Sequence, residues 1–237
     1  LERRIADGRL AYQGGRGSGD ATADGVAAGG APRRSIPSPT TPLVGREAEA
    51  SALRRIVASE RLVTIVGAGG VGKTRLATDL ARRHDEAHWV ALAALDTPDG
   101  LPRTLAAALG LETARGDVID ACSYLLGAGE QMLVLDNCEH VLAAAREVVS
   151  RLIQTCPSLT VLATSRERLG LADECTFRLG PLALPDPTSA HPETAPAMAL
   201  FLDRARRASL DFEPDAADRD AAVAVVRRLE GVPLAIE

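Results

Sequence analysis

The segment Gly67-Ala68-Gly69-Gly70-Val71-Gly72-Lys73-Thr74 matches the phosphate-binding pattern G-x-x-x-x-G-K-[ST] at every fixed position. Glycines allow successive backbone N–H groups to point at phosphate oxygens, and a helix that begins at the loop adds its positive end. Lys73 would hold the β- and γ-phosphates, and the Thr74 hydroxyl would ligate Mg²⁺. The residues of this stretch predicted to bind a nucleotide are Gly67, Gly69, Gly70, Val71, Gly72, Lys73, Thr74 and Arg75.

Composition supports the assignment of Lys73, which is the only lysine among the 27 Lys and Arg residues of the chain. A compact ammonium group on a flexible stem fits inside a phosphate loop, whereas a planar guanidinium does not. The flanking residues also fit. The β-branched apolar run Leu62–Val66 is typical of a buried parallel strand, and Leu76 and Leu80 stand at helical spacing within residues 74–83. This context disfavours the alternative of a glycine-rich turn that matches by chance.

A second chemical signal is an acid at the end of an apolar strand. The run Met132–Leu135 is followed directly by Asp136. A parallel sheet exposes such a carboxylate at the carboxyl end of its strand, where it can approach the Mg²⁺ ion opposite the phosphate loop. Thr74 and Asp136 are therefore the predicted Mg²⁺ ligands, and the two segments are read as Walker A and Walker B motifs.

The residue after Asp136 is Asn137, the only asparagine of the chain, where many hydrolytic phosphate-loop enzymes have a second acid. An amide cannot accept a proton, so the nearest carboxylate, Glu139, is the candidate general base. The alternative is that Glu139 is an acid at a helix N-terminus, where it favours the helix dipole. The missing second acid predicts slow hydrolysis, which suits a switch better than a motor.

The remaining periodicity predicts an α/β fold. Further strands are expected at 88–93, 159–164 and 174–179, and helices at 101–109, 117–126 and 139–156. The expected architecture is a three-layer αβα P-loop NTPase fold with a mostly parallel, five-stranded sheet. A small, purely helical subdomain is expected to follow it.

Composition divides the chain into three parts. Residues 1–41, after a short possible helix end at Leu1–Tyr12, are rich in Gly, Ala, Ser and Pro and are interpreted as a flexible linker. The predicted nucleotide-binding domain covers 42–185 and the helical subdomain covers 186–237, separated by proline-studded residues. Because the chain lacks an initiator Met and stops within a predicted helix, we expect a piece of a longer protein, with its helical subdomain truncated.

Charge and hydropathy exclude some classes of function. The formal net charge of -5 argues against nucleic-acid binding by this segment itself. No apolar run approaches the roughly 20 residues of a membrane span, and the N-terminal residues lack the apolar core of a signal peptide. The four cysteines form no C-x-x-C pair and are expected to be reduced, mostly buried thiols. Zinc binding by Cys138 and His140 is the weaker alternative, because no further ligands stand at recognisable spacing. We expect a cytoplasmic protein without a membrane partner.

Five segments in one order resemble the NB-ARC group of STAND-class P-loop ATPases. They are Leu43-Val44-Gly45-Arg46-Glu47, the Walker A and Walker B segments, Arg166 after the strand at 159–164, and Gly231-Val232-Pro233-Leu234-Ala235, which is similar to the G-L-P-L-A motif with Val for Leu. The resemblance implies that Val44, Gly45 and Arg46 lie against the adenine and that Pro233 contacts the nucleotide. It implies that Arg166 reads the γ-phosphate; the alternative is an exposed charged turn.

The amino-acid sequence around Asp136 and Arg166 looks most like that of actinobacterial regulators of the SARP and large LuxR types. In these regulators such an ATPase is joined to a DNA-binding module. The resemblance implies an ATP/ADP-binding, slowly hydrolysing switch, closed with ADP and self-associating with ATP, that reaches DNA only through a separate domain. Two alternatives stay open: the same module fused to a cyclase or kinase output, and a dedicated P-loop enzyme. Lys73, Asp136, Glu139 and Arg166 are the expected catalytic residues.

Overall fold

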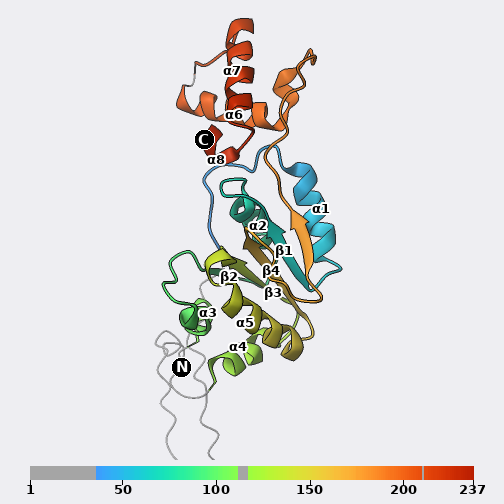
Figure 1. Cartoon of the computed structure of the whole chain (residues 1–237), viewed down its shortest axis with the longest axis vertical. Coiled ribbons are helices and arrows are strands. Elements are labelled where there is room, and N and C mark those ends of the chain that lie inside the picture. Colours follow the sequence, from blue (N-terminus) through green and yellow to red (C-terminus); the bar gives the residue numbers. More distant parts are fainter. Residues whose placement is uncertain (1–35, 112–116, 210) are drawn as a thin grey trace, which may run out of the picture.

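The computed structural model describes residues 36–111, 117–209 and 211–237 (Figure 1). The possible helix end at 1–12 and most of the predicted linker lie outside the described residues. Residues 36–41, which composition assigns to the linker, lie against the folded part of the chain. Ile36 packs against the hydrophobic core, and Thr41 accepts a hydrogen bond from Arg75.

The centre of the fold is a parallel sheet of five strands in the order β2-β3-β4-β1-β5. All four neighbouring pairs run parallel, so the sheet is parallel throughout, where the sequence predicted mostly parallel pairing. The strands are β1 Leu62–Val66, β2 Ala87–Ala91, β3 Gln131–Asp136, β4 Leu159–Ser165 and β5 Cys175–Arg178. β1 lies between β4 and β5 and is therefore an interior strand, so its carboxyl end is flanked by a strand on each side.

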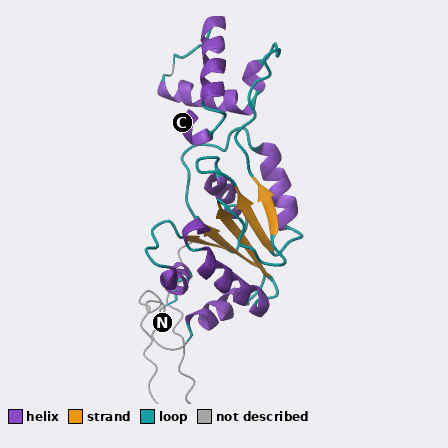
Figure 2. Cartoon of the chain, viewed as in Figure 1, coloured by secondary structure: helices purple, strands orange, loops and turns teal. Residues whose placement is uncertain are grey.

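Helices cover both faces of the sheet, because alternate side chains of the strands bury into two separate clusters (Figure 2). One cluster joins the sheet to α3 Leu101–Ala108, α4 Val118–Leu126 and α5 Leu142–Thr155. The other joins it to α1 Glu47–Val57 and α2 Lys73–Ala81. The three-layer αβα architecture predicted from the sequence is thereby confirmed.

The C-terminal residues form a helical region with its own hydrophobic cluster, seen beyond the carboxyl ends of the strands in Figure 1. Its helices are α6 Pro196–Ala208, α7 Ala216–Arg228 and the short α8 Pro233–Ile236. Asp215 and Asp218 form a capping box at the start of α7, in which the side chain of each accepts a hydrogen bond from the backbone N–H of the other. Short 3-10 turns occur at Pro98–Gly100, Cys138–His140 and Pro192–Thr194.

The segment after β3 differs from the prediction of one continuous helix from Glu139. Asn137 adopts a left-handed conformation (φ 70°), a 3-10 turn follows at Cys138–His140, and α5 begins only at Leu142. Asparagine is among the few non-glycine residues that adopt this conformation readily. Glu139 therefore lies in a tight turn and not in the first turn of a long helix.

The described cysteines are free thiols, three of them buried and Cys175 partly buried. Burial raises the pKa of the Cys138 thiol to about 12, with a smaller contribution from the Asp136 charge. Among the residues that the structure describes, no group of three or more His, Cys, Asp or Glu side chains could hold a metal ion. No helix within those residues is long and apolar enough to cross a membrane.

Candidate functional site

The predicted phosphate loop connects the carboxyl end of β1 to the first residue of α2, Lys73. Two of its glycines are required by backbone conformation, because Gly70 and Gly72 have φ values of 79° and 97°. Gly67 is required by space, since a Cβ there would stand 2.3 Å from the Leu179 carbonyl oxygen. The glycine spacing of the motif thus corresponds to the shape that the loop adopts.

Lys73 lies inside this loop with only 9% of its surface exposed. Its Nζ donates hydrogen bonds to the carbonyl oxygens of Gly67 (2.8 Å) and Ala68 (2.9 Å), so the loop itself orients the ammonium group. Burial lowers the pKa of Lys73, while the nearby Glu139 carboxylate acts in the opposite direction and favours the charged form. An anion bound beside Nζ would favour the charged form further.

The predicted Mg²⁺ residues lie together at the ends of α2 and β3. The Thr74 hydroxyl donates to Asp136 Oδ1 at 2.8 Å. Thr164, at the end of β4, donates to the same oxygen at 2.6 Å and accepts a hydrogen bond from the Asn137 N–H at 2.9 Å. A hydroxyl beside a carboxylate is the hard oxygen pair that Mg²⁺ prefers, so the residues present fit that ion.

Thr164 was missed by the sequence analysis. It is 1% exposed and fixes both Asp136 and the backbone of Asn137. A signal existed, because Thr164 ends a strand expected to neighbour the one that ends at Asp136, and the carboxyl ends of parallel strands meet at one edge of a sheet.

Glu139 and Arg166 meet beside the phosphate loop, although they come from different connections. Arg166 Nε lies 3.2 Å from Glu139 Oε1, and a Cβ on Gly69 would lie 3.7 Å from Arg166 Nη2. Within the described residues, Glu139 Oε2 is buried without a hydrogen-bond partner. A buried carboxylate oxygen that lacks a partner favours bound water or another donor at this position.

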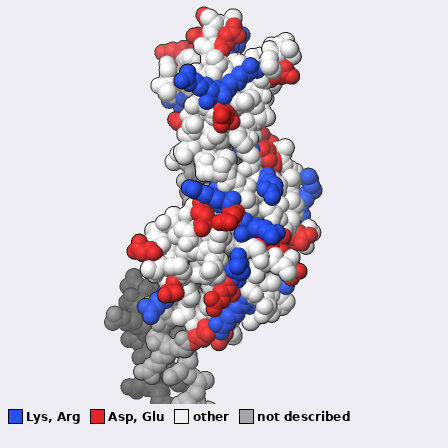
Figure 3. Space-filling view, viewed as in Figure 1, with Lys and Arg blue, Asp and Glu red and all other residues white. Residues whose placement is uncertain are grey.

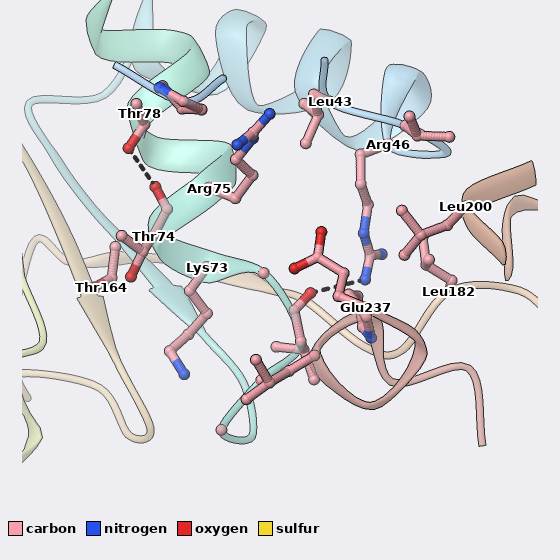
Figure 4. Close-up of a pocket in the computed structure, with 18 of the residues that line it drawn as sticks. Leu43, Arg46, Lys73, Thr74, Arg75, Thr78, Thr164, Leu182, Leu200 and Glu237 are labelled. Atoms are coloured by element: carbon pink, nitrogen blue, oxygen red, sulfur yellow. Dashed lines mark hydrogen bonds between the residues drawn. The ribbon is translucent and has the colours of Figure 1, made fainter. Parts of the chain in front are cut away.

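These groups line a cavity of about 640 Å³ between the phosphate loop and the helical region (Figure 4). The predicted residues that line it are Val44, Arg46, Gly69, Gly70, Val71, Gly72, Lys73, Thr74, Arg75, Glu139, Arg166 and Pro233. Predicted residues outside the lining are Gly45, Gly67 and Asp136. The lining also contains residues that were not predicted to belong to the site, among them Leu43, Thr164, Leu182, Leu200, Arg204 and Glu237.

Arg46 has protein partners that differ from its predicted contact with the adenine. It is 5% exposed, and its Nη2 donates to the carbonyl oxygens of Val71 (3.0 Å) and Gly180 (2.6 Å). Its Nη1 lies 2.5 Å from Glu49 Oε1. The guanidinium therefore joins the phosphate loop to the segment after β5, and its role in this structure is to support the loop.

Replacing Arg46 with Gln is expected to lower the free energy of unfolding by about 2 to 3 kcal/mol, because the Val71 and Gly180 carbonyls lose a charged donor in a buried place. Urea denaturation of the full chain measures this change. Arg54→Gln, in the helix that begins directly after Arg46, is the matched control. Its side chain is 44% exposed, so we expect a change within about 0.5 kcal/mol. Equal stability losses in both variants would contradict the supporting role of Arg46.

Gly45 lies against the start of the helical region. Its φ is 70°, and a Cβ there would stand 2.9 Å from Pro196 Cβ at the start of α6. Val44, beside it, packs against the hydrophobic cluster of the helical region. The predicted adenine-contact segment therefore also joins the sheet region to α6.

A direct contact also joins the phosphate loop to α8. The Leu234 N–H donates to the Gly70 carbonyl oxygen at 3.2 Å, and a Cβ on Gly70 would lie 2.9 Å from Leu234 Cβ. Just before α8, the Gly231 carbonyl accepts a hydrogen bond from the Leu182 N–H at 2.8 Å. The helical region is thus packed onto the loop that would hold the phosphates, and Pro233, which the resemblance assigns to the nucleotide, lies in the cavity wall.

Comparison with solved structures shows a shared fold. A STAND protein with a tetratricopeptide repeat sensor from Pyrococcus horikoshii superposes with a TM-score of 0.54 at 19% identity, covering 86% of this chain and 30% of that one. A Walker-type ATPase of Pyrococcus abyssi gives a TM-score of 0.50 at 15% identity, covering 82% of this chain and 66% of that one.

Two curated relatives come from Mycobacterium tuberculosis. An uncharacterised protein is 41% identical over 206 residues, which cover 83% of this chain and 49% of the relative. The protein named "Putative HTH-type transcriptional regulator Rv0890c" is 39% identical over 189 residues, which cover 78% of this chain and 20% of the relative. The chain thus spans about half the length of the first relative and a fifth of the second. The family model described as "AAA ATPase domain" matches residues 42–235, and the chain therefore belongs to the AAA ATPase domain family.

Proposed function

We propose that this chain is the ATP/ADP-dependent switch domain, of the NB-ARC type within the STAND class, of a multidomain transcriptional regulator. The main support for the proposal is the hydrogen bond from the Leu234 N–H to the Gly70 carbonyl. This bond joins the helical region to the phosphate loop, so a ligand that changes the loop would also change the position of the helical region. The mycobacterial relative named as an HTH-type regulator supports the assignment, since this chain matches only 20% of its length. We further propose the SARP or LuxR type, acting on antibiotic or secondary-metabolite genes.

Nucleotide binding is assigned to the residues that line the cavity around the phosphate loop. Lys73 would hold the terminal phosphates, and the backbone N–H groups of the loop would contact the others. Thr74 and Asp136 would hold Mg²⁺, which would neutralise phosphate charge. Val44 would lie against the base, and Pro233 would contact the nucleotide from the helical region.

Hydrolysis is proposed to be slow. The position after Asp136, where many phosphate-loop enzymes have an acid, holds Asn137, which cannot accept a proton. Glu139 is the proposed base, and its Oε1 is paired with Arg166 Nε at 3.2 Å. Arg166, with 69% of its side chain exposed, is free to turn toward a terminal phosphate.

The switch would couple nucleotide binding to the arrangement of two domains. These are the nucleotide-binding domain, proposed as 42–185, and the helical subdomain, proposed as 186–237. A nucleotide at about a thousand times its dissociation constant stabilises the arrangement it binds by about 4 kcal/mol. Moving a two-state equilibrium from mostly off to mostly on takes about 5.5 kcal/mol. Nucleotide identity can therefore supply most of a switch, with ADP favouring a closed form and ATP a self-associating one.

DNA is proposed to be contacted only by a separate domain. The chain has a formal net charge of -5, and the face seen in Figure 3 carries basic and acidic side chains mixed together. A surface that binds the phosphate backbone of DNA needs clustered Lys and Arg.

Steady-state ATP turnover tests the proposed function. The full chain with Mg²⁺ is expected to hydrolyse well below the roughly 10 ATP per second of a typical enzyme. Glu139→Gln should slow this turnover by about a hundredfold or more while ATP still binds. Glu167→Gln, a neighbouring exposed glutamate, is the control and should hydrolyse like the parent.

Rapid turnover by the chain alone, many ATP per second, would indicate a dedicated enzyme and contradict the switch. If Glu139→Gln hydrolyses as fast as the parent, the assignment of the base is wrong. Gel filtration with ATP or ADP tests self-association separately.

A further inference from the structure

Besides Glu139, a second carboxylate lies in the cavity, whose charged lining is otherwise made of Lys and Arg side chains. Glu237, directly after α8, lines the cavity together with the cations Lys73 and Arg46. In Figure 4 it lies between Lys73 on one side and Leu182 and Leu200 on the other. A negative charge would repel the phosphates of a nucleotide, so a different part of the ligand is the better partner for this carboxylate.

The position of this carboxylate is fixed by an ion pair. Glu237 Oε1 pairs with Arg204 Nη2, and Arg204 Nη1 lies 2.5 Å from Asp203 Oδ2. The Arg204 side chain is 18% exposed and also lines the cavity. The pair joins α6 to the residue after α8, and the carboxylate oxygens of Glu237 serve as hydrogen-bond acceptors at this place.

The cavity has a polar end and an apolar end. Lys73 and Thr74 mark the polar end, where the phosphates belong, and Leu182 and Leu200 mark the apolar end. A nucleotide carries its two ribose hydroxyls between its phosphates and its base. These hydroxyls are donors, and a carboxylate between the two ends is placed to accept from them, as an acidic residue does at dinucleotide sites of another fold.

We infer that Glu237, positioned by Arg204, accepts hydrogen bonds from the ribose hydroxyls of the bound nucleotide and makes the site selective for ribonucleotides over deoxyribonucleotides. This inference rests on the proposed nucleotide binding. It assigns the helical region a role in recognising the sugar, in addition to the contact that α8 makes with the phosphate loop.

The test is the ratio of dissociation constants for ADP and its 2′-deoxy and 3′-deoxy analogues, measured by calorimetry with Mg²⁺ on the full chain. The parent is expected to favour ADP over at least one analogue by about tenfold or more, because a hydrogen bond to a charged group is lost. Glu237→Ala should bring that ratio close to one, and Glu237→Gln, which keeps an uncharged acceptor, should give an intermediate ratio. Glu213→Ala, an exposed glutamate in the loop before α7, should match the parent.

Three results would overturn the inference while leaving nucleotide binding intact. The parent could bind ADP and both analogues equally, Glu237→Ala could keep the parent's ratio, or Glu237→Ala could bind all three more tightly by one common factor. The last result would show that the carboxylate only obstructs the cavity. Absence of ADP binding by the parent would instead overturn the proposed function, and the inference with it.

Discussion

Replacing Lys73 with alanine is expected to weaken the binding of ATP and ADP by about a hundredfold or more, because truncating one member of a desolvated charge pair costs about 3 kcal/mol. The chain has no second lysine that could take its place. The fold should persist, since within the described residues Nζ donates to just the loop carbonyls of Gly67 and Ala68, and Lys73 is outside their hydrophobic clusters. Calorimetric titration with each nucleotide, beside a circular dichroism spectrum of the variant, measures both expectations.

Lys73→Arg separates the effect of charge from that of shape. A guanidinium keeps the positive charge but needs more room than the loop provides around Nζ, so affinity should also fall. If Lys73→Ala binds ATP as tightly as the parent, the glycine loop is not the phosphate site and its assignment must be abandoned.

Asp136→Asn is expected to make nucleotide binding insensitive to Mg²⁺. Asn has the same shape and keeps an oxygen acceptor for the Thr74 and Thr164 hydroxyls, but it lacks the charge that attracts the ion. The parent should bind ADP more tightly with Mg²⁺ than with EDTA by roughly thirtyfold, which corresponds to about 2 kcal/mol, and the variant should show no difference. Titrations in the two buffers give both values.

Asp136→Ala provides a useful contrast. It removes the charge and also leaves the Thr164 hydroxyl without its buried acceptor, which should cost a further 1 to 3 kcal/mol or so of folding free energy. An Asp136→Asn variant that still responds to Mg²⁺ like the parent would show that the ion, if bound, is held elsewhere.

The sequence predicted the regular elements well because each is specified by a local pattern. The strand at Leu62–Val66 was placed with the bounds that the structure has, and Asp136 ends its strand as expected. Gly70 and Gly72 are required by local backbone conformation, which a motif records directly, whereas Gly67 is required by the close approach of the Leu179 carbonyl. The left-handed Asn137 was not predicted, because its conformation depends on the direction that the chain takes after β3, which tertiary packing decides.

Contacts between distant segments could not be derived in this way. The adenine contact of Arg46 stays a prediction, but its hydrogen bonds to the carbonyls of Val71 and Gly180 were not predicted, because only the folded chain brings these groups together. The pairing of Arg204 with Glu237 depends on how α6 and α8 pack, and no periodicity in either segment encodes it. Fold and phosphate loop were therefore predictable, whereas the apolar end of the cavity and its sugar-facing side were not.

The most direct test of nucleotide binding is equilibrium dialysis of the purified full chain against radiolabelled ADP with Mg²⁺, after any nucleotide carried through purification has been removed. We expect one adenine nucleotide bound per chain at saturation, displaced by unlabelled ATP. A chain that retains no ADP or ATP at about 1 mM ligand, a concentration that would reveal even weak binding, would contradict the assignment of this cavity as a nucleotide site.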